Sequence, residues 1–143
     1  MTDPYRRAAG AYSRGNCFHT DPRRLEGTVL LQAAQRLDEL RRGWSPQSAA
    51  ELEPALLHNR KLWTIFATEM ADDASALPVE VRNNVASLAI FVFKRSLELA
   101  MRPAAEPIAA LVEINRAVAA GLLAAAPPAC GLTAQAGFDL PAA

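Results

Sequence analysis

The chain has 143 residues, and its fifteen lysines and arginines balance fifteen aspartates and glutamates, so its formal net charge is zero. This neutrality excludes a global electrostatic field that would draw the protein to nucleic acid or to an anionic membrane. Hydrophobic residues make up 51% of the chain but aromatic residues only 6%, which favours closely packed helices over a β-sandwich.

Two signals in the first third of the chain predict helix starts. In each, an aspartate that can cap a helix precedes a proline that suits the first helical turn. Asp3 and Pro4 begin a predicted short helix. Asp21 and Pro22 begin a second one, which we expect to run to about residue 42, where Gly43 supplies the stop.

Prolines also delimit the three later helices. A proline beyond the first turn clashes with the preceding backbone, so Pro54 predicts that the third helix begins near Leu52 or Glu53 and runs to about residue 71. We expect a fourth helix from Pro78 to about residue 101 and a fifth from Pro107 to about residue 123.

The fourth helix carries two apolar stripes on nearly opposite sides, and helices that are apolar on both sides are buried centrally. One stripe includes Val85 and Val92, and the other includes Ile90 and Leu97. We therefore expect this helix in the middle of the molecule and the last three helices to supply most of the core. The sequence predicts one all-α domain over residues 1–124, a bundle of about five helices, followed by a mobile Pro/Ala-rich tail over residues 125–143.

Signatures of catalysis and of metal or cofactor binding are missing from the sequence. It has no glycine-rich phosphate loop and no CxxC or HExxH motif, and His19 and His58 stand alone. Cys17 and Cys130 have no partner pattern. We expect a protein that is not an enzyme and holds no metal or cofactor. Since no run approaches the roughly eighteen apolar residues of a membrane span, we also expect a cytoplasmic protein without membrane insertion.

Polar residues interrupt the apolar seams of these helices. Asn59 and Asn115 occupy core-type positions, Arg95 stands where a seam of the fourth helix expects an apolar residue, and Asn83 and Asn84 lie earlier on that helix. One interpretation is a hydrogen-bond cluster between helices that fixes their register. The other is that part of the seam is open and accepts a helix from a partner.

Trp63 shares the seam of Asn59 and also has two interpretations. It is either a core aromatic whose indole N–H bonds to a neighbour, or an anchor for a partner. Leu57, Lys61 and Ile65 lie off the main seam. Exposure of these residues around an apolar patch would indicate a second helix-docking groove.

Several motifs follow one another in order along the chain: NRKLWTIF at residues 59–66, LPVEVRNNVASL at 77–88, FVFKR at 91–95, INR at 114–116 and AAGL at 119–122. Together with RLE at residues 24–26, they resemble the FlaF family, the flagellar biosynthesis regulators of alphaproteobacteria. The resemblance covers residues 5–123.

What the resemblance implies is a factor that promotes flagellin synthesis and secretion, and that binds flagellin as a substrate-specific export chaperone. FlbT and the flagellar export apparatus are further candidate partners. Flagellin's terminal segments are amphipathic, so a small bundle with an apolar groove would cover them until export. The candidates for partner contact or for the polar seam are Asn59, Arg60, Lys61, Trp63, Ile65, Phe66, Asn83, Asn84, Phe91, Lys94, Arg95, Asn115 and Arg116.

A second hypothesis is post-transcriptional control of flagellin, exerted on its mRNA directly or through FlbT. Direct contact would use the basic residues near the start of the chain, and its affinity would fall steeply with salt. The neutral net charge favours apolar docking instead, and we do not expect direct nucleic-acid binding. A structural adaptor that binds only another assembly protein is a third hypothesis. The basic residues are Arg6, Arg7, Arg14, Arg23 and Arg24.

Overall fold

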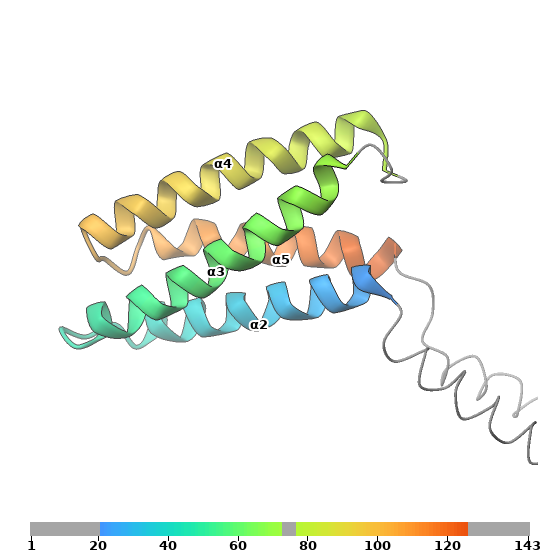
Figure 1. Ribbon diagram of the computed structural model, residues 1–143. Coiled ribbons are helices and arrows are strands. Elements are labelled where there is room, and N and C mark those ends of the chain that lie inside the picture. Colours follow the sequence, from blue (N-terminus) through green and yellow to red (C-terminus); the bar gives the residue numbers. More distant parts are fainter. Residues whose placement is uncertain (1–20, 73–76, 126–143) are drawn as a thin grey trace, which may run out of the picture.

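The computed structural model describes residues 21–72 and 77–125, which form four α-helices (Figure 1). They are α2 (Pro22–Arg42), α3 (Ser48–Ala71), α4 (Val79–Met101) and α5 (Ile108–Ala125). These residues contain no strand, which confirms the all-α class. The predicted first helix and almost all of the predicted tail lie outside the described residues, so the structure accounts for four of the roughly five predicted helices.

The limits of α2 follow from its capping residues, as predicted. The Asp21 carboxylate accepts a hydrogen bond from the backbone N–H of Arg23 at 3.2 Å, and Pro22 occupies the first turn. At the other end the N–H of Gly43 donates to a carbonyl of the last turn, that of Glu39, at 3.1 Å. These contacts satisfy groups that every helix end leaves unpaired.

The start of α3 differs from the prediction. The helix begins at Ser48, so that Pro54 lies inside it. Proline removes the hydrogen bond to the carbonyl four residues earlier, which here belongs to Ala50. Both residues are exposed, and water can therefore pair with that carbonyl. A proline on the solvent side of a helix did not force the helix to start later.

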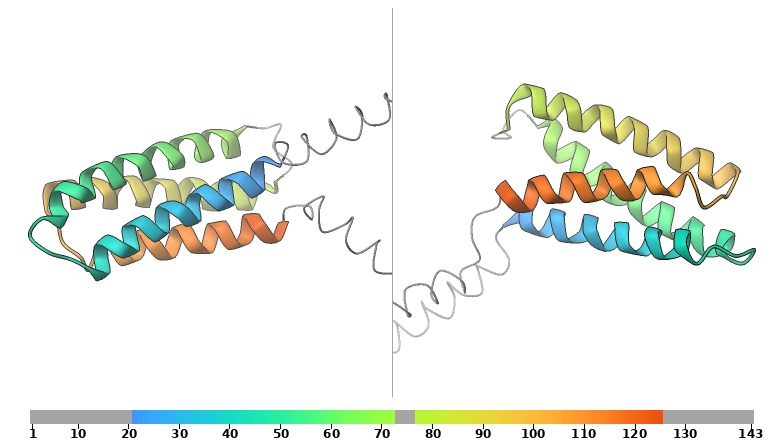
Figure 2. Two further views of the ribbon diagram at one scale, coloured as in Figure 1. Left: turned by 90° about the horizontal axis from the view of Figure 1, so that it is seen from below. Right: turned by 180° about the vertical axis from the view of Figure 1, so that it is seen from behind.

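The helices are arranged in an open bundle. α2 and α5 lie side by side, and α3 runs diagonally from the end of α2 to the start of α4 (Figures 1 and 2). α4 packs mainly on α3 and has only a narrow contact with α5.

The expected central position of α4 is wrong. Its buried residues lie on one face only and are Val85, Ala89, Val92, Ser96 and Leu99. On the opposite stripe, Ile90 is 60% exposed and Leu97 is 57% exposed. The reason is that α5 pairs with α2, so that none of the described helices covers this second stripe. The expectation that the last three helices supply most of the core is confirmed, since most of the buried hydrophobic residues lie on α3, α4 and α5, and α2 adds Leu30, Ala33, Ala34 and Leu37.

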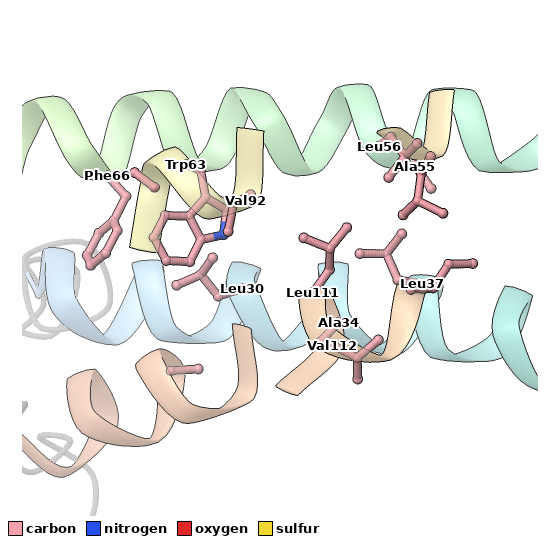
Figure 3. Close-up of a cluster of buried hydrophobic side chains, with 14 of the residues drawn as sticks. Leu30, Ala34, Leu37, Ala55, Leu56, Trp63, Phe66, Val92, Leu111 and Val112 are labelled. Carbon is pink, nitrogen blue, oxygen red and sulfur yellow. The ribbon is translucent and has the colours of Figure 1, made fainter. Parts of the chain in front are cut away.

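All four helices contribute to one apolar cluster in the interior (Figure 3). Trp63 of α3 is fully buried and meets Phe66 edge-on, with the ring centroids 5.5 Å apart. Leu30 of α2 and Val92 of α4 lie beside this aromatic pair. Each such side chain contributes about 1.5–3 kcal/mol when it leaves water, so this cluster is a main source of stability.

α5 is long and apolar enough to cross a membrane by length and composition alone, with a mean hydropathy of 1.6 over 18 residues. This finding corrects the expectation that no run of the chain approaches a membrane span. It is weak evidence for a span, because the core helix of a soluble protein passes the same test. The absence of membrane insertion stays a prediction.

Candidate partner-binding site

A fully buried polar cluster joins three helices inside the apolar core. The indole Nε1–H of Trp63 donates to the side-chain oxygen of Asn115 at 2.8 Å. The Asn115 amide nitrogen in turn donates to the side-chain oxygen of Asn59 at 2.7 Å and to the backbone carbonyl of Leu30 at 3.3 Å. This confirms the predicted hydrogen-bond cluster and the predicted bond of the indole. α2, α3 and α5 are thereby held in one register.

The cluster fills the part of the seam in which a partner helix could have docked under the second interpretation. Asn59, Trp63 and Asn115 have no exposed surface, so in this structure they cannot contact a partner. The Nδ2 atom of Asn59 is buried without a hydrogen-bond partner. Such an orphan group costs about 1–3 kcal/mol, which indicates that Asn59 provides specificity of packing more than stability.

Arg95 does not belong to this cluster, contrary to its expected place in the apolar seam. Its side chain is partly buried at the edge of α4, where it forms an ion pair with Glu98 at 3.5 Å and covers the ring of Phe91 at 5.2 Å. The buried polar residue of α4 is instead Ser96, whose hydroxyl donates to the carbonyl of Val92 at 2.7 Å. The signal in the sequence for the burial of Ser96 was its position seven residues after Ala89, on the same face of the helix.

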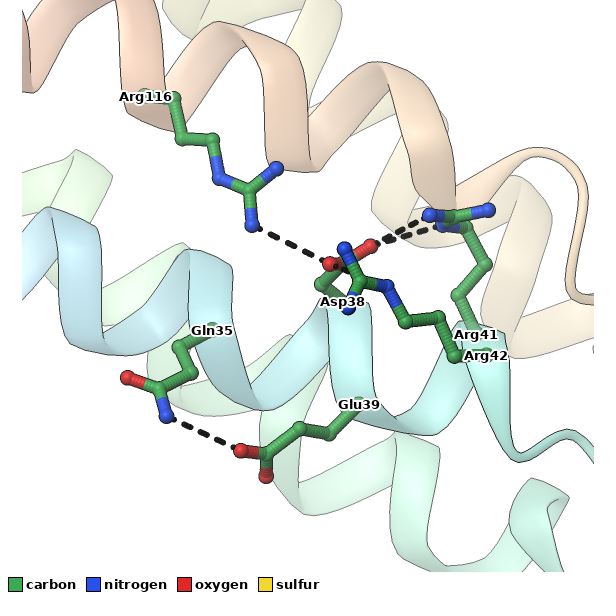
Figure 4. A network of polar contacts seen from close by, with 6 residues as sticks. All are labelled: Gln35, Asp38, Glu39, Arg41, Arg42 and Arg116. Carbon is green, nitrogen blue, oxygen red and sulfur yellow. Dashed lines mark hydrogen bonds and ion pairs between the residues drawn. The ribbon is translucent and has the colours of Figure 1, made fainter.

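A second network surrounds Asp38 on α2 (Figure 4). Its carboxylate, almost fully buried, accepts from Arg41 at 2.7 Å, pairs with Arg42 at 3.0 Å and reaches Arg116 of α5 at 3.2 Å. The hydrogen bond from Arg41, followed by that from Arg116, lowers the pKa of Asp38 despite its burial. Arg116, a sequence candidate, therefore helps to join α5 to α2. Sequence reasoning missed Asp38.

An apolar groove runs between α2 and α3. We call it the α2–α3 groove. Two large side chains stand open at it: Leu25 is 64% exposed and Ile65 is 58% exposed. Leu57, Lys61 and Ile65 are all exposed, but of these three only Ile65 lines the groove, so the condition set for a second docking groove is met in part. The residues that line it are Pro22, Leu25, Glu26, Val29, Leu30, Leu62, Ile65, Phe66 and Glu69.

Two carboxyl groups meet in this groove, one from each helix. Glu26 of α2 forms a side-chain hydrogen bond with Glu69 of α3, and its pKa is raised to about 8. Desolvation is the main cause, followed by the bond to Glu69 and by the charge of that residue; Asp21 adds to the shift and Arg23 opposes it. Sequence reasoning did not single out either glutamate.

A shallower hollow lies between α4 and α5, where these helices barely touch. It is lined by Asn84, Ser87, Leu88, Phe91 and Ile114. Two of the sequence candidates, Asn84 and Phe91, are thus brought together here.

The remaining candidates lie apart on the surface. Asn83 and Lys94 are exposed on α4, and Lys61 is exposed on α3. Arg60 is partly buried and lies 4.0 Å from a carboxylate oxygen of Glu53. The candidates therefore separate into a buried set that holds the helices together, a few residues at two apolar hollows, and others that are scattered over the surface.

Comparison with known protein families finds a match to the model described as "Flagellar protein FlaF", over residues 8–122. This range contains the whole part of the chain that forms α2, α3 and α4 and most of α5. Neither a curated protein nor a solved structure matches the chain.

Proposed function

Because this chain belongs to the FlaF family of flagellar proteins, we propose that it promotes flagellin synthesis and secretion by binding flagellin as a substrate-specific export chaperone. It acts in the cytoplasm, not as an enzyme, and covers an amphipathic helix of flagellin until export. The observation that carries this proposal is the α2–α3 groove, whose open aliphatic side chains suit the apolar face of a helix.

The chemistry of the groove supports an apolar contact with a polar rim. Leu25 and Ile65 expose large aliphatic surface at the groove, while Glu26 and Glu69 supply polar groups beside it. Interfaces of this kind have an apolar centre and a polar edge. The neutral net charge of the chain gives no long-range attraction, so affinity depends on this short-range contact.

The test is a binding titration of purified flagellin with the Ile65→Ser variant and with Ile90→Ser as its matched control. The two isoleucines are almost equally exposed, at 58% and 60%, but only Ile65 lines the groove. We expect Ile65→Ser to weaken the complex about tenfold or more, because burial of one such side chain is worth about 1.5–3 kcal/mol. Ile90→Ser should leave the affinity unchanged.

Circular dichroism melts of both variants check that the bundle remains folded. The wild-type complex should persist at about 1 M salt, where charge interactions are screened beyond ~3 Å. Absence of any complex with flagellin would overturn the proposed function. A loss of affinity with Ile90→Ser alone would move the contact from the α2–α3 groove to α4.

The alternative is post-transcriptional control of flagellin, on its mRNA directly or through FlbT. Arg6, Arg7 and Arg14 lie outside the described residues. The other two basic residues stand beside acidic groups, since Arg24 lies 3.9 Å from Asp21 and the charge of Arg23 acts on Glu26. A complex with flagellin mRNA whose affinity falls steeply with salt would favour this alternative.

A further inference from the structure

α4 carries an apolar stripe that none of the described helices covers, and we call it the outer stripe. It consists of Ala86, Ile90, Phe93, Leu97 and Met101, which share one side of the helix. Ile90 is 60% exposed, Leu97 is 57% exposed and Met101 is 81% exposed. A different face of α4 packs into the core. Contiguous apolar residues on a protein surface indicate an interaction site.

The spacing of the outer stripe indicates that its occupant is another helix. From Ala86 to Met101 its residues follow one another by steps of four, three, four and four. These steps are close to the alternation of three and four that marks the seam between two paired helices. None of the five residues lines the α2–α3 groove or the hollow between α4 and α5. The stripe therefore suits an element that lies along α4.

Two exposed charges on one border of the outer stripe indicate which helix fits. Lys94 and Glu98 lie four residues apart and so share one side of α4. Glu98 pairs with Arg95 at 3.5 Å but keeps 66% of its side chain exposed. A border with one charge of each sign is complementary to a second copy of itself when the order is reversed, as it is in an antiparallel pair.

We propose that the outer stripe pairs α4 with α4 of a second copy of this chain, in an antiparallel dimer whose twofold axis passes at the level of Ser96. Lys94 and Glu98 each lie two residues from Ser96, so each lysine faces the glutamate of the other copy. Ile90 lies six residues before Ser96 and Met101 five residues after it. These two side chains thus meet across the interface at heights that differ by about 1.5 Å.

The same register also brings the two copies of Leu97 together. Leu97 lies one residue from the level of the axis, so the two leucines are separated by about 3 Å in height. Ser96 itself is buried in the core of its own chain and marks only the level of the axis. One register therefore joins the opposite charges and the large apolar side chains at once.

This dimer is independent of the proposed contact with flagellin. The residues that line the α2–α3 groove all belong to α2 and α3, so pairing through α4 leaves the groove open. Pairing also gives α4 a second buried face, which the single chain lacks. The amide hydrogens of α4 therefore exchange fastest in dilute solution and more slowly as the dimer forms.

The experiment is sedimentation equilibrium of the full chain under reducing conditions, from about 1 μM to about 1 mM, a range that covers weak protein pairs. For the wild-type chain we expect a reversible equilibrium of monomer and dimer. Leu97→Glu should weaken the dimer at least about a hundredfold, because it replaces two apolar side chains at the axis by two like charges. Leu57→Glu is the matched control, since Leu57 is 43% exposed on α3, and it should dimerise like the wild-type chain. Circular dichroism melts check that both variants are folded.

Two charge reversals test the contact between the borders. In a dimer of Lys94→Glu the facing borders carry only acidic groups, and in a dimer of Glu98→Lys only basic ones. Each variant alone should therefore dimerise about tenfold more weakly than the wild-type chain. An equimolar mixture places an acidic border against a basic one, and we expect it to dimerise at least as well as the wild-type chain.

Disulfide trapping tests the antiparallel direction, in a chain with Cys17→Ser and Cys130→Ser. A mixture of Ile90→Cys with Met101→Cys should form covalent dimers on oxidation. Each variant alone should not, because the two copies of either residue lie about 15 Å or more apart along the dimer. Covalent dimers of Ile90→Cys alone would show a parallel pair and overturn the proposed register.

The other outcomes also decide the proposal. A wild-type chain that stays monomeric over the whole range would overturn it, and a loss of flagellin binding in Leu97→Glu would then assign the stripe to a flagellin helix. Dimerisation that Leu97→Glu leaves unchanged would place the interface on another face and overturn it as well. A mixture of the charge variants that associates no better than each variant alone would contradict the pairing of Lys94 with Glu98.

Discussion

At the residue scale, Asn115 holds the three helices together because one amide group serves three partners. Its oxygen accepts from Trp63, and its nitrogen donates to Asn59 and to the carbonyl of Leu30. Asn59 contributes one acceptor and leaves one buried donor unpaired. The two asparagines look equivalent in the sequence, but the network makes them unequal.

This inequality predicts that Asn115→Leu and Asn59→Leu differ in stability. Asn115→Leu leaves the indole N–H of Trp63 and the side chain of Asn59 in the core without their hydrogen-bond partner. We expect it to lower the free energy of unfolding by about 2–4 kcal/mol. Asn59→Leu removes the orphan donor together with one bond, so we expect a change within about 1 kcal/mol. Urea unfolding followed by circular dichroism measures both. A larger loss in Asn59→Leu would contradict the assignment of Asn115 as the centre of the network.

At the scale of elements, the close approach of α2 and α5 decides the architecture. Gly27 of α2 faces α5, where a Cβ atom would lie 2.8 Å from the Cγ of Leu123 and 3.3 Å from the carbonyl oxygen of Ala119. The glycine thus allows two backbones to pack closely. Further along α2, the buried carboxylate of Asp38 and the guanidinium of Arg116 join the same two helices. α4 has no comparable contact with α5.

The contact at Gly27 predicts opposite effects of one substitution at two helical glycines. Gly27→Ala must displace Leu123 and the backbone of α5, and we expect a loss of about 1–2 kcal/mol even after the better helix propensity of alanine is counted. Gly121→Ala on α5 has open space around its new methyl group, and we expect a gain of about 0.5–1 kcal/mol. Thermal melts of the two variants test this. Stabilisation by Gly27→Ala would mean that the helices have room to separate.

At the scale of the whole molecule, three of the described helices are held together more firmly than the fourth, α4. α2, α3 and α5 share the buried polar cluster, whereas α4 is held mainly by its one face on α3. The aliphatic residues on its outer stripe, such as Met101 at 81% exposure, add nothing to that attachment. Stability is therefore distributed unevenly over the described helices.

This uneven attachment predicts that α4 opens before the rest of the bundle. Elements with few buried contacts open locally at a lower free energy than the core. We expect the amide hydrogens in the middle of α4 to exchange at least about tenfold faster than those in the middle of α2 and α5, a difference of about 1.4 kcal/mol. Hydrogen exchange read by mass spectrometry measures it. Equal protection in all the helices would show that α4 unfolds only with the whole domain.

The sequence by itself determined most of the local structure. Asp21, Pro22 and Gly43 set the limits of α2, Pro78 and Pro107 precede α4 and α5, and the spacing of Asn59 and Asn115 indicated their buried bond. These features follow from the chain's own backbone chemistry and periodicity, and the ordered motifs also indicated the family.

Only the tertiary structure decided how the helices meet. Periodicity shows which residues share a face, but not which face finds a neighbour. For this reason it could not foresee the exposure of Ile90 and Leu97, or that Pro54 points to solvent and is tolerated. Nor could it pair Glu26 with Glu69 or Asp38 with Arg116, because each pair joins helices whose contact depends on packing. The groove and its carboxyl pair exist only where α2 and α3 come together.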